Sequence, residues 1–104
     1  MRVFLDDTRQ PPDGYTLVRT AEEAIELLKS GSVTHLSLDH DLGIFTETGE
    51  VTGYNVVLWL EQAVVEGTLT PPEVITVHSS NPGARTKMEL AIKSIRRLAE
   101  QDRQ

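Results

Sequence analysis

Residues 35–43 read His-Leu-Ser-Leu-Asp-His-Asp-Leu-Gly, and this stretch decides the fold that we expect. Polar and apolar residues alternate over 35–38, which is the period of a β-strand. The strand runs directly into Asp39, His40 and Asp41, so three groups able to bind protons or metals stand at its carboxyl end. Residues 42–53 follow with three glycines and little pattern, and we expect a loop there.

Three more segments have the composition of strands. Residues 3–5 form an apolar run that ends at Asp6 and Asp7, and residues 74–77 form a β-branched run that ends at His78. Residues 15–18 follow a turn with two prolines and a glycine. The connection between the first two strands has no helical pattern, so we expect a loop in place of a helix.

Three amphipathic helices are predicted between and after these strands. The first follows Thr20, a good N-cap, and the second covers 54–66. The third begins at Pro82 with Asn81 as its N-cap. Strands that alternate with helices predict an α/β domain with a parallel sheet and right-handed crossovers.

Length and composition exclude several classes of protein. A chain of 104 residues with 38% hydrophobic residues predicts a single folded domain over 1–104. The lack of cysteine excludes disulfides and thiolate chemistry, and with no apolar run long enough for a membrane span it favours the cytoplasm. The net charge of −6 argues against binding an extended nucleic-acid backbone but allows a nucleotide or a nucleic-acid end as ligand.

The carboxylates at the strand ends predict a metal site. The carboxyl ends of parallel strands meet at one edge of the sheet, so Asp6, Asp7, Asp39 and Asp41 are expected to gather there. Two carboxylates about 4 Å apart repel by roughly 4 kcal/mol at an effective dielectric constant near 20. Either one of them stays protonated or a cation lies between them. Hard oxygen ligands suit Mg²⁺ or Mn²⁺. The alternative is that one aspartate caps a turn and another pairs with Arg9.

Two histidines are expected at the same edge. His40 and His78 follow different strands, so they can flank one substrate as acid and base near neutral pH, beside Asp39 as a third catalytic candidate. The alternative for either histidine is a polar residue satisfied by its neighbours.

A phosphate-binding region is predicted at the start of the last helix. Free backbone N–H groups at a helix N-terminus attract anions, and guanidinium groups bind oxyanions bidentately. The candidates for substrate binding are Arg9, Ser79, Ser80, Asn81 and Arg85. Plain N-capping by Asn81 is an alternative that is compatible with this hypothesis.

In four blocks, residues 5–9, 37–43, 52–54 and 77–83, the chain resembles the cyclic-phosphate-processing receiver-like domains of bacteria and phages. The resemblance covers nearly the whole chain in order. It implies a flavodoxin-like, receiver-like parallel sheet of about four strands in the order 2-1-3-4, with helices on both faces.

In response-regulator receivers, an acidic pair, a phosphoacceptor aspartate and a hydroxyl residue end the first, third and fourth strands. Asp6 with Asp7, Asp39 and Ser79 stand in those places. The chain departs from that pattern because it shows no fifth strand with its lysine, lacks the first helix, and adds His40 and His78. These departures favour catalysis over phosphorelay signalling.

The resulting hypothesis is a metal-dependent phosphoesterase, a hydrolase of the phosphodiesterase type, that processes the cyclic phosphate of a nucleotide or an RNA end. A non-catalytic receiver-like or nucleotide-binding regulatory module is the second reading. A protein-interaction domain with an acidic edge is the third. The identity of the substrate, the metal and the oligomeric state stay open at this point.

Overall fold

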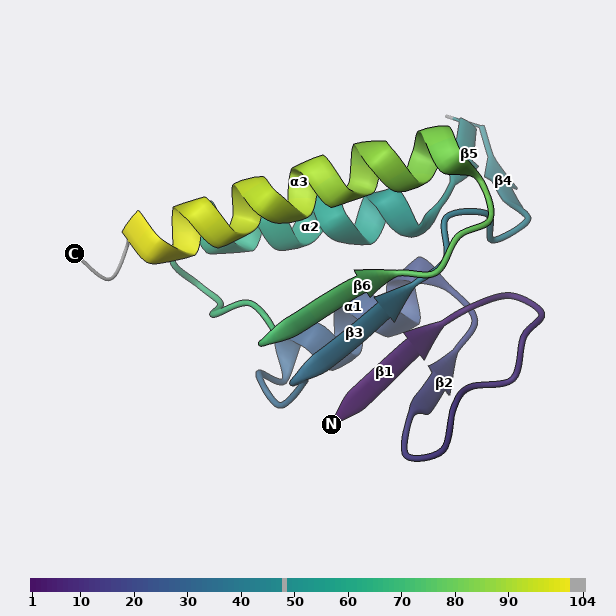
Figure 1. Ribbon diagram of the computed structural model, residues 1–104, viewed down its shortest axis with the longest axis horizontal. Helices are drawn as coiled ribbons and strands as arrows, with labels where there is room; N and C mark the ends of the chain where they lie inside the picture. The colour runs from purple at the N-terminus through teal and green to yellow at the C-terminus, as the bar shows by residue number, and fades with distance from the viewer. Residues whose placement is uncertain (48, 102–104) are drawn as a thin grey trace.

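A four-stranded parallel sheet organises the computed structural model, which describes residues 1–47 and 49–101 (Figure 1). The strand order is β2-β1-β3-β6, and every neighbouring pair is parallel. The expected order of four strands and the receiver-like fold are therefore confirmed. The strands are β1 (Arg2–Leu5), β2 (Thr16–Val18), β3 (His35–Leu38) and β6 (Val74–Val77).

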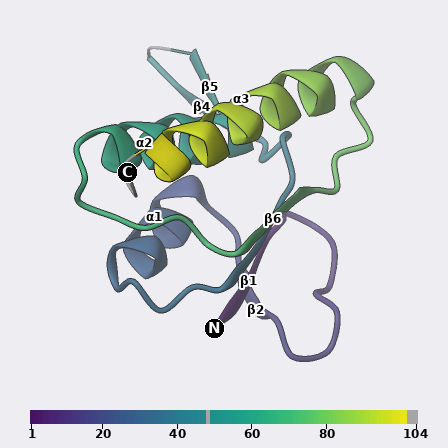
Figure 2. The same cartoon turned by 60° about the vertical axis from the view of Figure 1, so that its left-hand side comes forward.

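Three helices pack with this sheet around one hydrophobic core. They are α1 (Ala21–Lys29), α2 (Gly53–Val65) and α3 (Pro82–Gln101), and Figure 2 shows α2 and α3 side by side. The core joins alternate strand residues to apolar residues of all three helices, among them Leu28, Leu60 and Ile95. On β1, Val3 and Leu5 belong to this core, as the two-residue period of a strand requires.

The other face of β1 carries Phe4, which is buried outside that core. The ring of Tyr15 meets Phe4 edge-on at 6.3 Å between centroids, and the ring of His78 stacks on it at 4.3 Å. Aromatic packing of this kind stabilises by burying area and by favourable ring geometry. His78, which follows β6, thus covers part of this face of the sheet.

The helix starts agree with the sequence signals. Thr20 Oγ1 accepts a hydrogen bond from the Glu23 backbone N–H, and Asn81 Oδ1 accepts one from the Ala84 N–H. A third cap, Thr52 with Asn55 in a capping box, was not expected. These side chains satisfy N–H groups that a helix start leaves without intrahelical partners.

The two expected loops differ in outcome. The connection from β1 to β2 is a loop, as predicted (Figure 1). The prediction of a loop over 42–53 was wrong in part, because β4 (Ile44–Thr46) and β5 (Gly49–Val51) pair as an antiparallel hairpin. These two strands are short and lie among the glycines and polar residues of 42–53, so the sequence pattern did not reveal them, whereas the equally short β2 was marked by the prolines and glycine before it.

Gly53 allows the first turn of α2 to lie against the end of β3. A Cβ atom at this position would stand 1.8 Å from the backbone oxygen of Asp39. The Gly53 N–H also donates to the backbone oxygen of His40 at 2.9 Å. Glycine is therefore required here for close packing of two backbones, at a point that places Asp39.

We expect Gly53→Ala to lower the free energy of unfolding by roughly 1–3 kcal/mol or more, because the added methyl group overpacks a filled space. Gly83→Ala is the matched control, since its Cβ would meet only Asn81 Oδ1 at an ordinary 3.7 Å. Alanine favours a helix by up to about 1 kcal/mol over glycine, so this variant should be unchanged or more stable. Urea unfolding of both variants is the measurement, and equal losses would contradict the assignment.

Candidate functional site

Strand register brings the predicted site residues together. Leu5, Leu38 and Val77 are register partners across β1, β3 and β6. The next residues on these strands are Asp6, Asp39 and His78, and the backbone bonds continue from Asp39 N to Leu5 O and from His78 N to Leu38 O. One ligand atom from each of these three side chains lies within 4.8 Å of the others.

Asp6 is a fully buried carboxylate with its hydrogen bonds satisfied. Its Oδ1 accepts from the backbone N–H groups of Thr8 at 2.9 Å and Arg9 at 2.8 Å, and its Oδ2 lies 3.0 Å from His78 Nε2. Burial raises the pKa of this carboxyl, but the two backbone donors and His78 outweigh burial, so the pKa is lowered below 3.8. Asp6 is therefore ionised at neutral pH.

The pKa of Asp39 is shifted in the opposite direction. Burial raises its pKa above 3.8, and the charges of Asp6 and Asp7 raise it further, against smaller lowering effects from the His40 N–H and from His78. Its Oδ1 accepts the His40 N–H at 2.8 Å. The negative charge of Asp39 is thus held in an unfavourable place, which a bound cation would relieve.

The other predicted metal ligands and the second histidine lie in different surroundings. Asp7 is half-buried, and its Oδ2 lies 3.5 Å from the position of a Cβ on Gly43. His40 and Asp41 form a second group with Glu50 of β5, in which His40 Nδ1 lies 2.7 Å from Asp41 Oδ1. The structure therefore divides the predicted cluster into two groups, one of Asp6, Asp39 and His78 and a more exposed one of His40, Asp41 and Glu50.

The predicted phosphate ligands surround the start of α3 and the β1–β2 loop. Ser79 is buried, and its Oγ accepts the Asn81 N–H at 3.1 Å. Arg9 is exposed and donates to the His78 backbone oxygen at 3.4 Å, which places it at the same edge. Ser80 is exposed, and the exposed Arg85 pairs with Glu89 at 2.8 Å.

Sequence reasoning missed three residues that build this edge. Arg19 follows Val18, the register partner of Leu5, and donates to the backbone oxygens of Asp6 at 3.1 Å and Arg9 at 3.4 Å. Ser37 Oγ lies 2.7 Å from His78 Nδ1, and Phe4 stacks on the His78 ring. Arg19 could have been found by its position directly after a strand, whereas the contacts of Ser37 and Phe4 depend on register.

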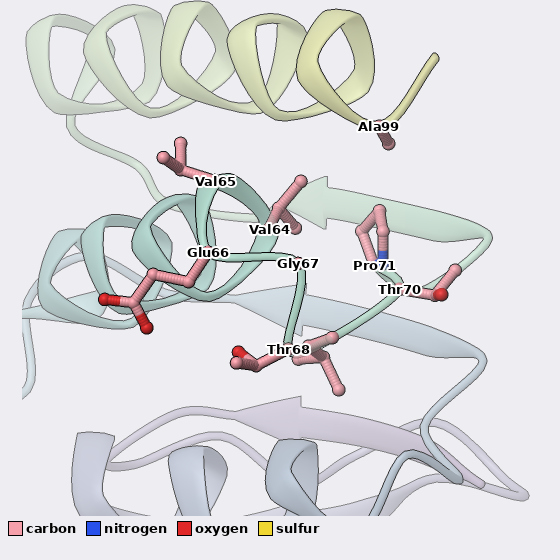
Figure 3. Close-up of a pocket in the computed structure, with 9 residues that line it drawn as sticks. Val64, Val65, Glu66, Gly67, Thr68, Thr70, Pro71 and Ala99 are labelled. Carbon is pink, nitrogen blue, oxygen red and sulfur yellow. The ribbon is translucent and has the colours of Figure 1, made fainter. Parts of the chain in front are cut away.

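Two hollows on the surface lie away from this edge. One of about 540 Å³ opens between the ends of α2 and α3 and the segment before β6, where Val64, Pro71 and Ala99 line it (Figure 3). Another of about 560 Å³ lies beside β2 and α1 and is lined by Thr16, Glu23 and Leu27 among others. Neither includes Asp6, Asp39 or His78, so the functional assignment follows the side-chain chemistry at the sheet edge.

A family model described as cyclic-phosphate processing receiver domain matches residues 1–94. The chain belongs to this family. The resemblance noted in the sequence is thereby confirmed, and it associates this domain with cyclic-phosphate processing. No curated protein and no solved structure matched the chain. Within residues 1–47 and 49–101, no helix of this receiver domain is both long and apolar enough to cross a membrane.

We expect Asp6→Asn and Asp39→Asn to change stability in opposite directions at pH 7 with divalent cations removed. Asp6→Asn should lower the free energy of unfolding by about 1–3 kcal/mol, because it weakens a buried hydrogen-bonded charge. Asp39→Asn should raise it, because it removes a charge that folding places in unfavourable surroundings. Urea unfolding in the presence of a chelator measures both effects.

The pH dependence of these effects also differs in sign. The pKa of Asp6 is lowered by folding, so its stabilisation is present above 3.8 and is lost as the pH falls through its folded-state pKa. The pKa of Asp39 is raised, so the advantage of Asp39→Asn disappears as the pH falls from the folded-state pKa toward 3.8. A destabilising Asp39→Asn variant at neutral pH would contradict this account.

Proposed function

We propose that this receiver domain is a metal-dependent phosphoesterase that hydrolyses the cyclic phosphate of a nucleotide or an RNA end. The observation that carries the proposal is that two carboxylates and an imidazole come together from three strands. One ligand atom of each, from Asp6, Asp39 and His78, lies within 4.8 Å of the others. The family supplies the link to cyclic phosphates. The absence of cysteine supports a reducing cytoplasm as the place of action.

The residues present fit a divalent cation. Asp39 carries a charge that its surroundings disfavour, and Asp6 Oδ2 has a lone pair beyond the one that faces His78. Asp6 and Asp39, with Asp7 beside them, would hold Mg²⁺ or Mn²⁺, whereas Asp41, which bonds to His40, would lie outside this set of ligands. When bound, the cation would neutralise charge on the phosphate and polarise its phosphoryl bond.

We assign proton transfer to the two histidines, His40 and His78. In the hydrolysis, water adds to phosphorus and one P–O ester bond breaks, so one proton leaves the water and one reaches the departing oxygen. We assign the imidazolium form of His78 to the leaving oxygen, because its Nε2 faces Asp6 and Asp39. Nε2 would give its proton to that oxygen while Nδ1 keeps the other proton. His40 is bonded to Asp41 through Nδ1, so its Nε2 would accept the proton of the water.

The positive and hydrogen-bonding groups of the same edge would bind the substrate phosphate. Arg9 and Ser79 stand beside His78, and the N-terminus of α3 begins next to Asn81. Ser80 is exposed beside them, and Arg85 would exchange its bond with Glu89 for the phosphate. The net charge of −6 restricts such binding to a nucleotide or an RNA end and disfavours an extended backbone or an anionic membrane.

A second candidate function is that of a phosphoacceptor module. It is favoured by the position of Ser79, a buried residue that follows β6 and His78. The neighbouring strand, β3, is followed by Asp39. In this case beryllofluoride should bind at Asp39 in the presence of Mg²⁺, and no cyclic nucleotide should be hydrolysed.

With a 2′,3′-cyclic nucleotide and Mg²⁺, we expect His78→Ala to lower kcat by about 10²–10⁴-fold, the usual contribution of a positioned acid or base. His35→Ala is the matched control, because His35 lies at the start of β3 and bonds to Thr34 at the opposite end of that strand. Its activity should equal that of the wild type. Equal turnover by the wild type and His78→Ala would contradict the proposed mechanism.

We also expect Mg²⁺ to stabilise the wild type but not Asp39→Asn. A ligand that binds only the folded state stabilises it by roughly 2.7 kcal/mol at 100 times its Kd. Asp13→Asn is the control, because Asp13 is exposed in the β1–β2 loop and its variant should keep the shift. Thermal melting with MgCl₂ against NaCl of equal ionic strength is the measurement, and equal shifts with the two salts would count against a metal site.

A further inference from the structure

The imidazole of His78 is held on three sides by groups of β1 and β3. Its Nδ1 lies 2.7 Å from Ser37 Oγ and its Nε2 lies 3.0 Å from Asp6 Oδ2. Its ring stacks on Phe4 with an angle of 4° between the planes. The stack fixes the plane of the ring, and the two polar contacts decide which nitrogen faces which partner.

The partner of Nε2 assigns the position of the ring proton. Asp6 is buried, and its Oδ1 already accepts two backbone N–H groups, as an ionised carboxylate does. A carboxylate only accepts hydrogen bonds, so Nε2 must donate. In a neutral imidazole the remaining nitrogen, Nδ1, then accepts, and the hydroxyl of Ser37 is the donor.

We infer that Ser37 is a positioning residue that holds His78 with Nε2 toward Asp6 and with the proton on that nitrogen. Ser37 is nearly buried on β3 and is two residues before Asp39, so its hydroxyl is fixed by the same strand that carries the carboxylate. A hydroxyl can also accept, so the contact survives when Nδ1 carries a proton. Ser37 acts on the reaction only through His78.

The consequence for activity rests on the proposed function. If His78 transfers a proton at Nε2, loss of the Ser37 hydroxyl removes the contact at Nδ1 and leaves the Asp6 contact and the Phe4 stack alone to position the ring. Outer partners of a catalytic or ligating histidine typically contribute about 10–100-fold to activity or affinity. The effect should appear in kcat, because Ser37 does not lie among the groups assigned to the substrate.

The test compares Ser37→Val with Ser37→Thr, two side chains of nearly the same shape that differ in the hydroxyl. Both are β-branched and suit a strand, so neither should prevent folding. In ¹⁵N-histidine NMR spectra of the substrate-free protein, the wild type and Ser37→Thr should show His78 with a protonated Nε2 and an unprotonated Nδ1. Ser37→Val should keep the proton on Nε2, because Asp6 remains its acceptor, but the ¹⁵N shift of Nδ1 should change because this nitrogen loses its hydrogen bond. The kcat of Ser37→Val should fall about 10–100-fold while Ser37→Thr keeps wild-type kcat.

His78 spectra that are the same in Ser37→Val and the wild type would overturn the inference. Equal changes in both variants would also overturn it, because the hydroxyl would then not be the cause. The NMR result needs no substrate, so it separates this inference from the proposed function. A changed Nδ1 shift in Ser37→Val together with a wild type that hydrolyses no cyclic phosphate would support the positioning role and refute the phosphoesterase.

Discussion

The register between β1, β3 and β6 is the constraint on which the functional edge depends. Leu5, Leu38 and Val77 are register partners, so the residues that follow them lie level with one another at the edge of the sheet. Because paired residues of parallel strands point to the same face, Asp6, Asp39 and His78 leave the sheet together. A shift of one residue in any pairing would separate these side chains and move apolar residues out of the core.

The buried Asp6 and the half-buried Asp39 have different electrostatic roles at this edge. Asp6 is surrounded by donors, and its charge helps to hold the β1–β2 loop through the N–H groups of Thr8 and Arg9. Asp39 is next to Asp6 and has fewer compensating partners, so its charge is costly. A cation bound beside these carboxylates would offset the unfavourable charge of Asp39.

Several features of the fold could be predicted from local patterns. Apolar or alternating runs followed by polar residues marked three of the four parallel strands, and the turn before β2 marked the fourth. Thr20 and Asn81 marked helix starts because capping is a local interaction. The hairpin of β4 and β5 could not be predicted in this way, since its short strands lie among glycines and polar residues with no such signal. The close approach of Gly53 to Asp39 was also invisible, because it joins residues from two elements whose distance depends on packing.

The sequence by itself determined which chemical groups end the strands, because an apolar run that stops at Asp39 or His78 is a property of neighbouring residues. It also established the family, through four blocks in order. Only the tertiary structure decided which of these groups lie close together. One group contains Asp6, Asp39 and His78, with Ser37 and Phe4 in contact with His78. The other group contains His40, Asp41 and Glu50. The physical reason is that strand ends follow from local hydrophobic patterns, whereas pairings such as Ser37 with His78 depend on register and side-chain direction across strands far apart in the chain.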